Sequence, residues 1–191
     1  MRGARPSGEG AGAVDLPGRR DHGTEPEGEV PAKLTPEPAF VGAVLLVDFS
    51  IVRQALVHVR DDDFGDYRLR RVLAVARRLV AGGVRPDPVL VLAKAQADGD
   101  VTEPARITEF MLLLDTLVAN VPVAASIFWY AQAVIESAVR RRMAEMVTRI
   151  GQAIEGESLD SLIELEARED AAVRELAARR TTTPTPLRAV P

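Results

Sequence analysis

The chain has 191 residues and a slight acidic excess, with 24 basic against 28 acidic side chains and a net charge of −4. A domain that grips nucleic acid through its own surface normally carries a basic excess, so this balance argues against broad nucleic-acid binding. The absence of cysteine excludes disulfides, thiolate zinc sites and cysteine nucleophiles.

The two ends of the chain differ in composition from the middle. Residues 1–38 contain seven of the 14 glycines and six of the 13 prolines, but few large apolar side chains. Such a segment buries too little apolar surface to offset the entropy lost on ordering, so we predict a disordered arm over 1–38. The last residues predict a second disordered tail over 181–191.

No part of the sequence approaches the length of an apolar signal-peptide core or the roughly 18 apolar residues of a membrane-spanning helix. We therefore expect a soluble, cytoplasmic protein that makes no contact with a membrane.

Residues 39–121 have a helical period throughout and predict a compact helical head. Asp, Ser and Pro residues that favour helix starts divide the segment, and the pair Gly82–Gly83 ends its longest helix. The predicted helix starts lie near Asp48 or Ser50, Asp66, Pro88 with Asp87 as its cap, and Pro104.

The longest helical signal comes last. Residues 123–154 contain no proline and one glycine, which predicts a single helix about 48 Å long. That length exceeds the diameter of a small core, so the helix must project beyond the head. After a break at 155–158, a second helix over about 159–178 turns back. The predicted class is therefore all-α, with the head followed by a long helix and an antiparallel helical hairpin over 122–180.

The apolar strip of this hairpin is thin, so we expect part of it to face a second copy or another protein. The candidate self-association or partner surface consists of Val139, Arg140, Arg141, Arg142, Met143, Met146, Val147, Ile150, Leu162 and Leu165.

Two segments, 62–91 and 120–142, resemble the N-terminal domain of DnaB-type replicative DNA helicases. The first has an acidic-Phe turn, a helix, a glycine stop and an Asp-Pro-Val sequence, and the second has an Asn-Val-Pro opening before the long helix. The matching structural motif consists of Asp63, Phe64, Asp87, Pro88, Asn120, Pro122, Ala124, Ala125, Ile127 and Tyr130.

The resemblance implies a domain whose hairpins pair, which forms a collar on a ring-shaped hexamer and docks primase. It therefore implies a homodimer or higher oligomer, with primase or a replicative helicase motor as partner and only indirect or weak contact with DNA. The sequence departs from the family at two places. The acidic opening of the first helix is replaced by residues 38–40, and the Tyr and His beyond the acidic-Phe turn are replaced by Gly65 and Leu69. Both changes bear on primase docking more than on the fold.

The sequence lacks the parts of a helicase motor. It has no G-x-x-x-x-G-K-S/T phosphate loop, and its only lysines are Lys33 and Lys94. We find no catalytic residues, no cofactor-binding residues and no metal ligands, so we do not expect an enzyme. Asp61, Asp62 and Asp63 are better explained as a capping, solvated turn than as part of a calcium loop.

Two further groups each have two interpretations. The aromatic residues 128–130 could stack on bases, although core packing at the junction of head and hairpin is the favoured interpretation. The arginines 140–142 could bind DNA phosphates, although a solvated helix face paired with Glu136 and Glu145 is favoured.

The sequence thus leads to two hypotheses for function. The first is a non-catalytic module acting in DNA replication as an oligomerisation and primase or helicase docking element. The alternative is a helical adaptor or DNA-binding regulator that kept the fold but left replication.

Overall fold

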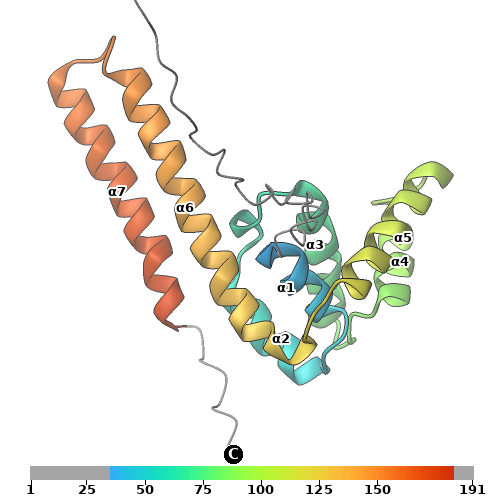
Figure 1. The fold of residues 1–191 in the computed structure, drawn as a ribbon. Helices are drawn as coiled ribbons and strands as arrows, with labels where there is room; N and C mark the ends of the chain where they lie inside the picture. The colour runs from blue at the N-terminus through green and yellow to red at the C-terminus, as the bar shows by residue number, and fades with distance from the viewer. Residues whose placement is uncertain (1–34, 183–191) are drawn as a thin grey trace, which may run out of the picture. The chain divides into compact units, whose positions relative to one another are not determined.

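A computed structural model of the chain describes residues 35–182, with side chains through residue 180. This part is all-α, as predicted, and contains no strand (Figure 1). The helices are α1 (Pro36–Val44), α2 (Phe49–His58), α3 (Tyr67–Ala81), α4 (Pro88–Ala97), α5 (Pro104–Ala119), α6 (Ile127–Ala153) and α7 (Leu159–Thr182), with short 3-10 turns η1 (Asp61–Asp63) and η2 (Ala124–Ser126). The predicted arm over 1–34 and the tail over 183–191 lie outside the described residues.

Cap geometry confirms the predicted helix starts at Asp66 and Asp87. The side chain of Asp66 accepts a hydrogen bond from the Arg68 amide, and that of Asp87 accepts one from the Leu90 amide at 2.8 Å. Asp48 is the N-cap of α2, but its side chain makes no capping bond. Gly83 ends α3 with a φ of +77°, a left-handed conformation that costs glycine no Cβ clash.

Three predicted boundaries are wrong by a few residues. Helix α1 begins at Pro36, inside the predicted arm, because proline suits the first helical turn and the Glu37 carboxylate accepts a bond from the Gly65 amide at 2.9 Å. Helix α7 continues to Thr182. The long helix begins at Ile127 and not at 123, since Val123 is extended and the η2 turn follows it.

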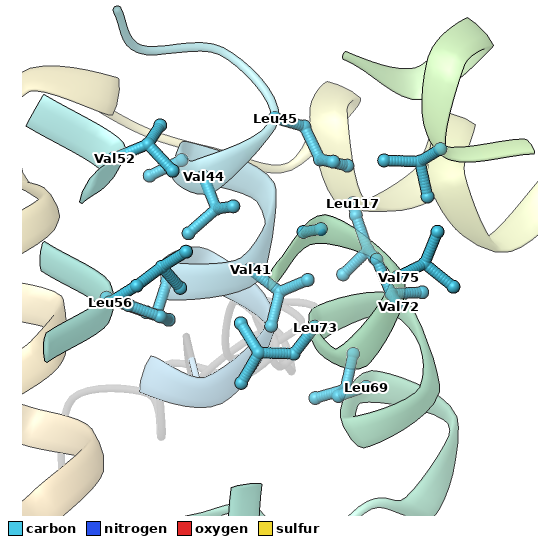
Figure 2. Close-up of a cluster of buried hydrophobic side chains, with 14 of the residues drawn as sticks. Val41, Val44, Leu45, Val52, Leu56, Leu69, Val72, Leu73, Val75 and Leu117 are labelled. Carbon is cyan, nitrogen blue, oxygen red and sulfur yellow. The ribbon is translucent and has the colours of Figure 1, made fainter. Parts of the chain in front are cut away.

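The core of the head is built around α1, which contacts α3, α5 and α6. Its residues 40–44 are completely buried or nearly so, among aliphatic side chains of α2, α3 and α5 (Figure 2). Each fully buried aliphatic side chain stabilises the fold by about 1.5–3 kcal/mol. The burial of α1 among the surrounding helices therefore stabilises the head.

Glycine is required where α1 crosses the end of α5. A Cβ at Gly42 would lie 2.3 Å from the Leu117 carbonyl oxygen and 2.4 Å from a methyl group of Val121. Only a residue without a side chain allows the two backbones this close approach. This contact could not be predicted from the sequence, because nothing local to Gly42 indicates which residues lie opposite it.

The long helix α6 is shared between the two parts of the fold. Its first half contributes the fully buried side chains of Ile127, Ala131, Val134 and Ile135 to the core of the head. Its second half extends beyond the head and packs against α7 (Figure 1). The core of the head therefore continues past residue 121. The head is therefore defined as α1–α5 with residues 127–135, and the hairpin as residues 136–153 with α7.

No single helix within residues 35–182 is both long enough and apolar enough to span a membrane. The consecutive segments 104–119 and 124–153 reach that threshold only as a pair, and they are bent by 94° at their junction.

Candidate interaction surface

The hairpin is held in register by a buried carboxylate. Glu169 of α7 is 2% exposed and accepts a hydrogen bond from Nη1 of Arg149 at 2.7 Å. Its other oxygen lies 2.8 Å from Nη2 of Arg142. The two arginines lie two helical turns apart on α6, so one carboxylate bridges them. A buried charge that must keep its partners allows few alternative alignments of the two helices.

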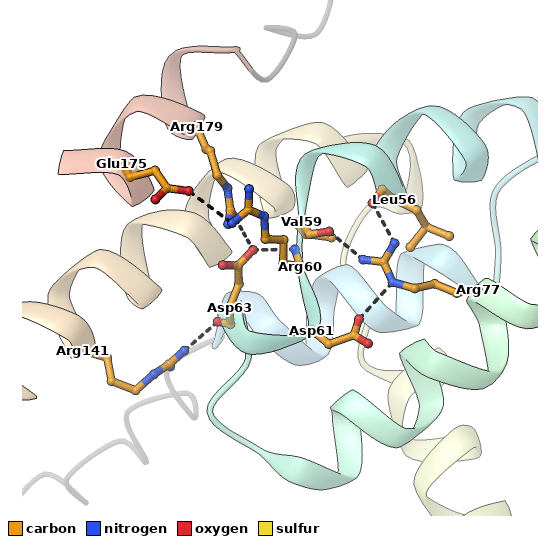
Figure 3. A network of polar contacts seen from close by, with 9 residues as sticks. All are labelled: Leu56, Val59, Arg60, Asp61, Asp63, Arg77, Arg141, Glu175 and Arg179. Carbon is orange, nitrogen blue, oxygen red and sulfur yellow. Dashed lines mark hydrogen bonds and ion pairs between the residues drawn. The ribbon is translucent and has the colours of Figure 1, made fainter. Parts of the chain in front are cut away.

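A second set of polar contacts ties the end of α7 to the head, centred on buried Asp63 (Figure 3). The Asp63 carboxylate accepts a hydrogen bond from the Arg60 amide at 2.6 Å and pairs with Arg179 of α7. Its carbonyl oxygen accepts a bond from Nη2 of Arg141 at 2.7 Å. Arg60 also pairs with Glu175 at 3.4 Å. Asp63 is therefore a hub that joins η1, α6 and α7.

The three consecutive arginines of α6 have different surroundings. Arg141 also pairs with Glu37 of α1 at 3.0 Å, so it faces the head. Arg142 faces α7 and lies 3.6 Å from Glu145. Arg140 is exposed and has no ion pair within residues 35–182. The three arginines therefore do not form an open phosphate-binding patch, because Arg141 and Arg142 form ion pairs within the chain.

The favoured interpretation of these arginines is correct only in part. Arg142 pairs with Glu145 as predicted, but Glu136 pairs with Arg180 of α7 at 3.0 Å. The predicted pairs lay within one helix, whereas several of the pairs formed here cross from α6 to α7 or to the head.

The hairpin leaves an apolar stripe on α6 uncovered. Met143 is 51% exposed and Val147 is 70% exposed, while Ile150 is half-buried and Ile154 is exposed. These four residues, spaced by four, three and four positions, are called the outer strip. Such spacing places them on one face of the helix.

The other members of the predicted surface are partly covered within the chain. Val139 is partly buried and packs against the core of the head. Met146, Leu162 and Leu165 are half-buried. Leu159 and Ile163 are also exposed, although they are not among the predicted surface residues, and so is Ile154 at the end of the stripe. Their positions beside the hairpin turn were the signal that could have indicated this.

The residues of the family-like motif have structural roles. Phe64 is buried with its ring centroid 5.9 Å from that of Phe40, and Ile127 is fully buried. The Tyr130 hydroxyl accepts a hydrogen bond from the Val123 amide at 3.2 Å, and the Asn120 side chain donates one to the Thr116 carbonyl at 2.8 Å. The remaining members occupy turns and caps: Asp63 in η1, Asp87 and Pro88 at the start of α4, and Pro122, Ala124 and Ala125 in the α5–α6 junction.

The aromatic residues at the start of α6 do not all pack as predicted. Phe128 packs against the core and makes an edge contact with His58, at 6.3 Å between ring centroids. Burial there lowers the pKa of the His58 imidazole below its ordinary value. The core-packing interpretation is wrong for Trp129, which is 53% exposed because it lies on the helix face turned away from the core.

The acidic turn is a polar junction between η1 and α3. Asp61 pairs with Arg77 at 2.9 Å, and the same arginine donates to the carbonyl oxygens of Leu56 and Val59 (Figure 3). Across the part of the chain that the structure describes, no three His, Cys, Asp or Glu side chains converge on one point. The predicted solvated turn applies to Asp62, which is exposed, but not to buried Asp63.

The chain is similar to solved structures but not to known families or curated sequences. No protein-family model matches the chain, and no curated protein sequence matches it. The structure is similar to the crystal structure of the N-terminal domain of DnaB helicase from Mycobacterium tuberculosis, with a TM-score of 0.64 and 27% sequence identity. The similarity covers 75% of this chain and 98% of that one. The resemblance predicted from the two sequence segments is therefore confirmed.

Proposed function

We propose that this DnaB-like helicase N-terminal domain acts in DNA replication as a non-catalytic module that self-associates through its hairpin and docks a partner. The observation that carries the proposal is the extent of the structural likeness, which covers 98% of the helicase N-terminal domain. The relevant similarity is therefore to the part of a helicase that precedes the motor.

The exposed apolar surface of the hairpin supports self-association. Val147 and Met143 are more than half exposed on a helix that already has a partner, α7. Large contiguous apolar surface is unusual on a monomer and marks protein contacts. A stripe of helical spacing is suited to pairing with the same stripe on a second copy, since a two-fold contact is self-complementary.

The polar contacts of the hairpin support a role as a rigid element. Glu169 fixes α7 on α6, and Asp63 fixes the end of α7 on the head. The outer strip therefore has a fixed orientation relative to the head when a partner binds the hairpin. Presenting a surface in fixed geometry reduces the entropy lost on association.

We propose primase or a separately encoded helicase motor as the docked partner. The reason is the likeness to a helicase N-terminal domain, together with the lack of a phosphate loop in these 191 residues. Direct DNA binding through residues 140–142 is not part of the proposal, because Arg141 and Arg142 are paired within the chain.

Charge placed on the outer strip tests self-association. We expect Val147→Glu to remove pairing through the outer strip and so to lower the mass of the chain at tens of micromolar, because a buried unpaired carboxylate opposes the contact. The matched control is Val57→Glu, a still more exposed valine on α2. Light scattering should show a mass above the monomer for the unmodified chain and the control. A monomeric unmodified chain, or equal masses for both variants, contradicts the proposal.

Docking is tested separately by capture. Immobilised chain should retain primase or the helicase motor from the source organism, and the control is the same chain with its head unfolded by Phe40→Asp. Failure to retain either protein, with self-association intact, would restrict the function to assembly.

A further inference from the structure

The head carries a groove that no side chain of residues 35–180 fills. It lies between the start of α3 and the length of α5, with a volume of about 630 Å³. Phe110 and Leu113 line its apolar part, while Tyr67 and Leu112 are 60% and 57% exposed beside it. A volume of this size with exposed apolar walls is suited to a pair of anchoring side chains.

Three arginines and two carboxylates line the rim of the head groove, which leaves a small positive excess: Arg68, Arg71 and Arg106 against Asp66 and Glu109. Arg68 pairs with Asp66 at 2.7 Å and Arg106 pairs with exposed Glu103 at 3.5 Å, so Arg71 is the rim arginine that has no carboxylate partner within residues 35–182. The Arg71 guanidinium carbon lies 5.8 Å from the centroid of the Phe110 ring, which places a cation over the apolar floor. The groove therefore favours an apolar occupant flanked by acidic groups.

The hairpin turn of the same chain carries that chemistry. Leu159 and Ile163 lie one helical turn apart at the start of α7 and are 72% and 58% exposed. No lysine or arginine occurs from 150 to 167. The five acidic residues of this stretch are exposed and have no ion pair within residues 35–182: Glu155, Glu157, Asp160, Glu164 and Glu166. Residues 154–166 are called the hairpin tip.

The tip cannot reach the groove of its own chain. It lies at the end of the hairpin that points away from the head (Figure 1). The 27 residues of α6 correspond to about 40 Å of helix. Any contact between tip and groove must therefore join two copies.

We infer that the hairpin tip of one copy binds the head groove of a second copy, with Leu159 and Ile163 as apolar anchors between the arginines of the rim. This contact goes beyond the proposed function, because it uses neither the outer strip nor a foreign partner. The two contacts also differ in symmetry. Binding of a tip to a groove is a head-to-tail contact, which either closes into a ring of copies or continues as a filament. Binding of an outer strip to a second outer strip gives a closed, two-fold pair.

Disulfide trapping tests the contact directly, because the chain has no cysteine of its own. Chains carrying Leu112→Cys are mixed with chains carrying Ile163→Cys under mild oxidation. We expect a mixed disulfide between them in a yield several-fold above that of the control pair, Val57→Cys with Ile163→Cys. The control position is also on the head and more exposed. Equal yields from the two pairs would overturn the inference.

Charge reversal tests the chemistry of the contact. Asp160→Lys with Glu164→Lys on the Ile163→Cys chain should weaken the association about tenfold or more, since like charges then face each other. Arg68→Glu with Arg106→Glu on the Leu112→Cys chain should restore the yield of the mixed disulfide. If neither charge reversal changes the yield of the mixed disulfide, the contact is apolar or accidental, and the inference is wrong.

A third experiment distinguishes the contact between tip and groove from the self-association of the proposed function. Adding Val147→Glu to both chains removes pairing through the outer strip but should leave the mixed disulfide between Leu112→Cys and Ile163→Cys. Self-association that Val147→Glu abolishes, with no mixed disulfide at any stage, would refute the inference and leave the proposed function standing. Binding of an acidic amphipathic peptide in the groove, without binding of a second copy, would also refute it.

Discussion

The head and the hairpin are held together by different forces. The head encloses large aliphatic and aromatic side chains on several helices, so its stability comes from apolar burial. The hairpin beyond residue 136 has a thin interface in which Glu169 and its two arginines are the most buried polar contact. Apolar side chains of the hairpin face outward at the outer strip and at the tip. The head thus closes its core within the chain, whereas the hairpin leaves apolar side chains exposed.

Truncation of the core should have the largest effect on the head. Phe40→Ala removes a completely buried ring that packs against Phe64, and we expect a loss of about 3–5 kcal/mol in the free energy of unfolding. Urea unfolding followed by circular dichroism measures it. Val147→Ala, in contrast, should change the stability of the monomer by less than about 0.5 kcal/mol. Similar losses for both would remove the distinction between head and hairpin.

Loss of the buried carboxylate should have the next largest effect and should act on the hairpin. We expect Glu169→Gln to cost about 1–3 kcal/mol, because Arg142 and Arg149 lose their shared anion. The matched control is Asp170→Asn, whose partner Arg174 is exposed and lies on the same helix, so its cost should stay near 0.3–0.5 kcal/mol, a rough figure for such pairs. Hydrogen exchange should show the loss confined to α7. Equal costs would mean that Glu169 does not set the register.

The helix caps of the head give a smaller and more local comparison. Asp87→Ala removes a side chain that accepts from the Leu90 amide, and we expect a loss of about 1 kcal/mol. Asp48→Ala is the control at an N-cap whose side chain makes no such bond, so it should cost clearly less. Thermal unfolding compares the two variants. The reverse order would contradict the cap geometry described here.

The smallest effect should be a pH dependence at the contact between α2 and α6. Burial lowers the pKa of His58 in the folded chain, so the unfolded chain binds more protons as the pH falls through about 6.5. This part of the stability is complete above that pH and is lost below it. We expect the melting temperature to fall between pH 7.5 and pH 5.5 by less in His58→Gln than in the unmodified chain. An unchanged slope would mean that His58 is solvated.

Much of the fold could be predicted from the sequence because its signals are local. Asp66 and Asp87 cap the helices that follow them, Gly82–Gly83 ends α3, and the helical period places Leu69, Val72 and Leu73 inside. Each of these signals depends on residues within one or two turns. The order and the approximate length of the helices follow from them.

The contacts that shape the candidate surface could not be predicted in this way. Asp63 and Arg179 are 116 residues apart, and nothing in either segment indicates the other. The sequence does not distinguish Glu169 from the other charged residues of α7, because its burial depends on the packing of α6 beside it. Periodicity defines the faces of a helix, but only the packed structure shows which face has a partner. For the same reason the exposure of Trp129 was predicted wrongly.

Hydrogen exchange measured at several protein concentrations tests the central claim most directly. If the core of the head is closed within the chain and the hairpin is covered by self-association, amides of residues 143–154 and 159–166 should gain protection as the concentration rises from about one to one hundred micromolar, while those of α1 and α2 stay constant. Protection of the hairpin that is independent of concentration would show that the chain is complete as a monomer and would contradict the account.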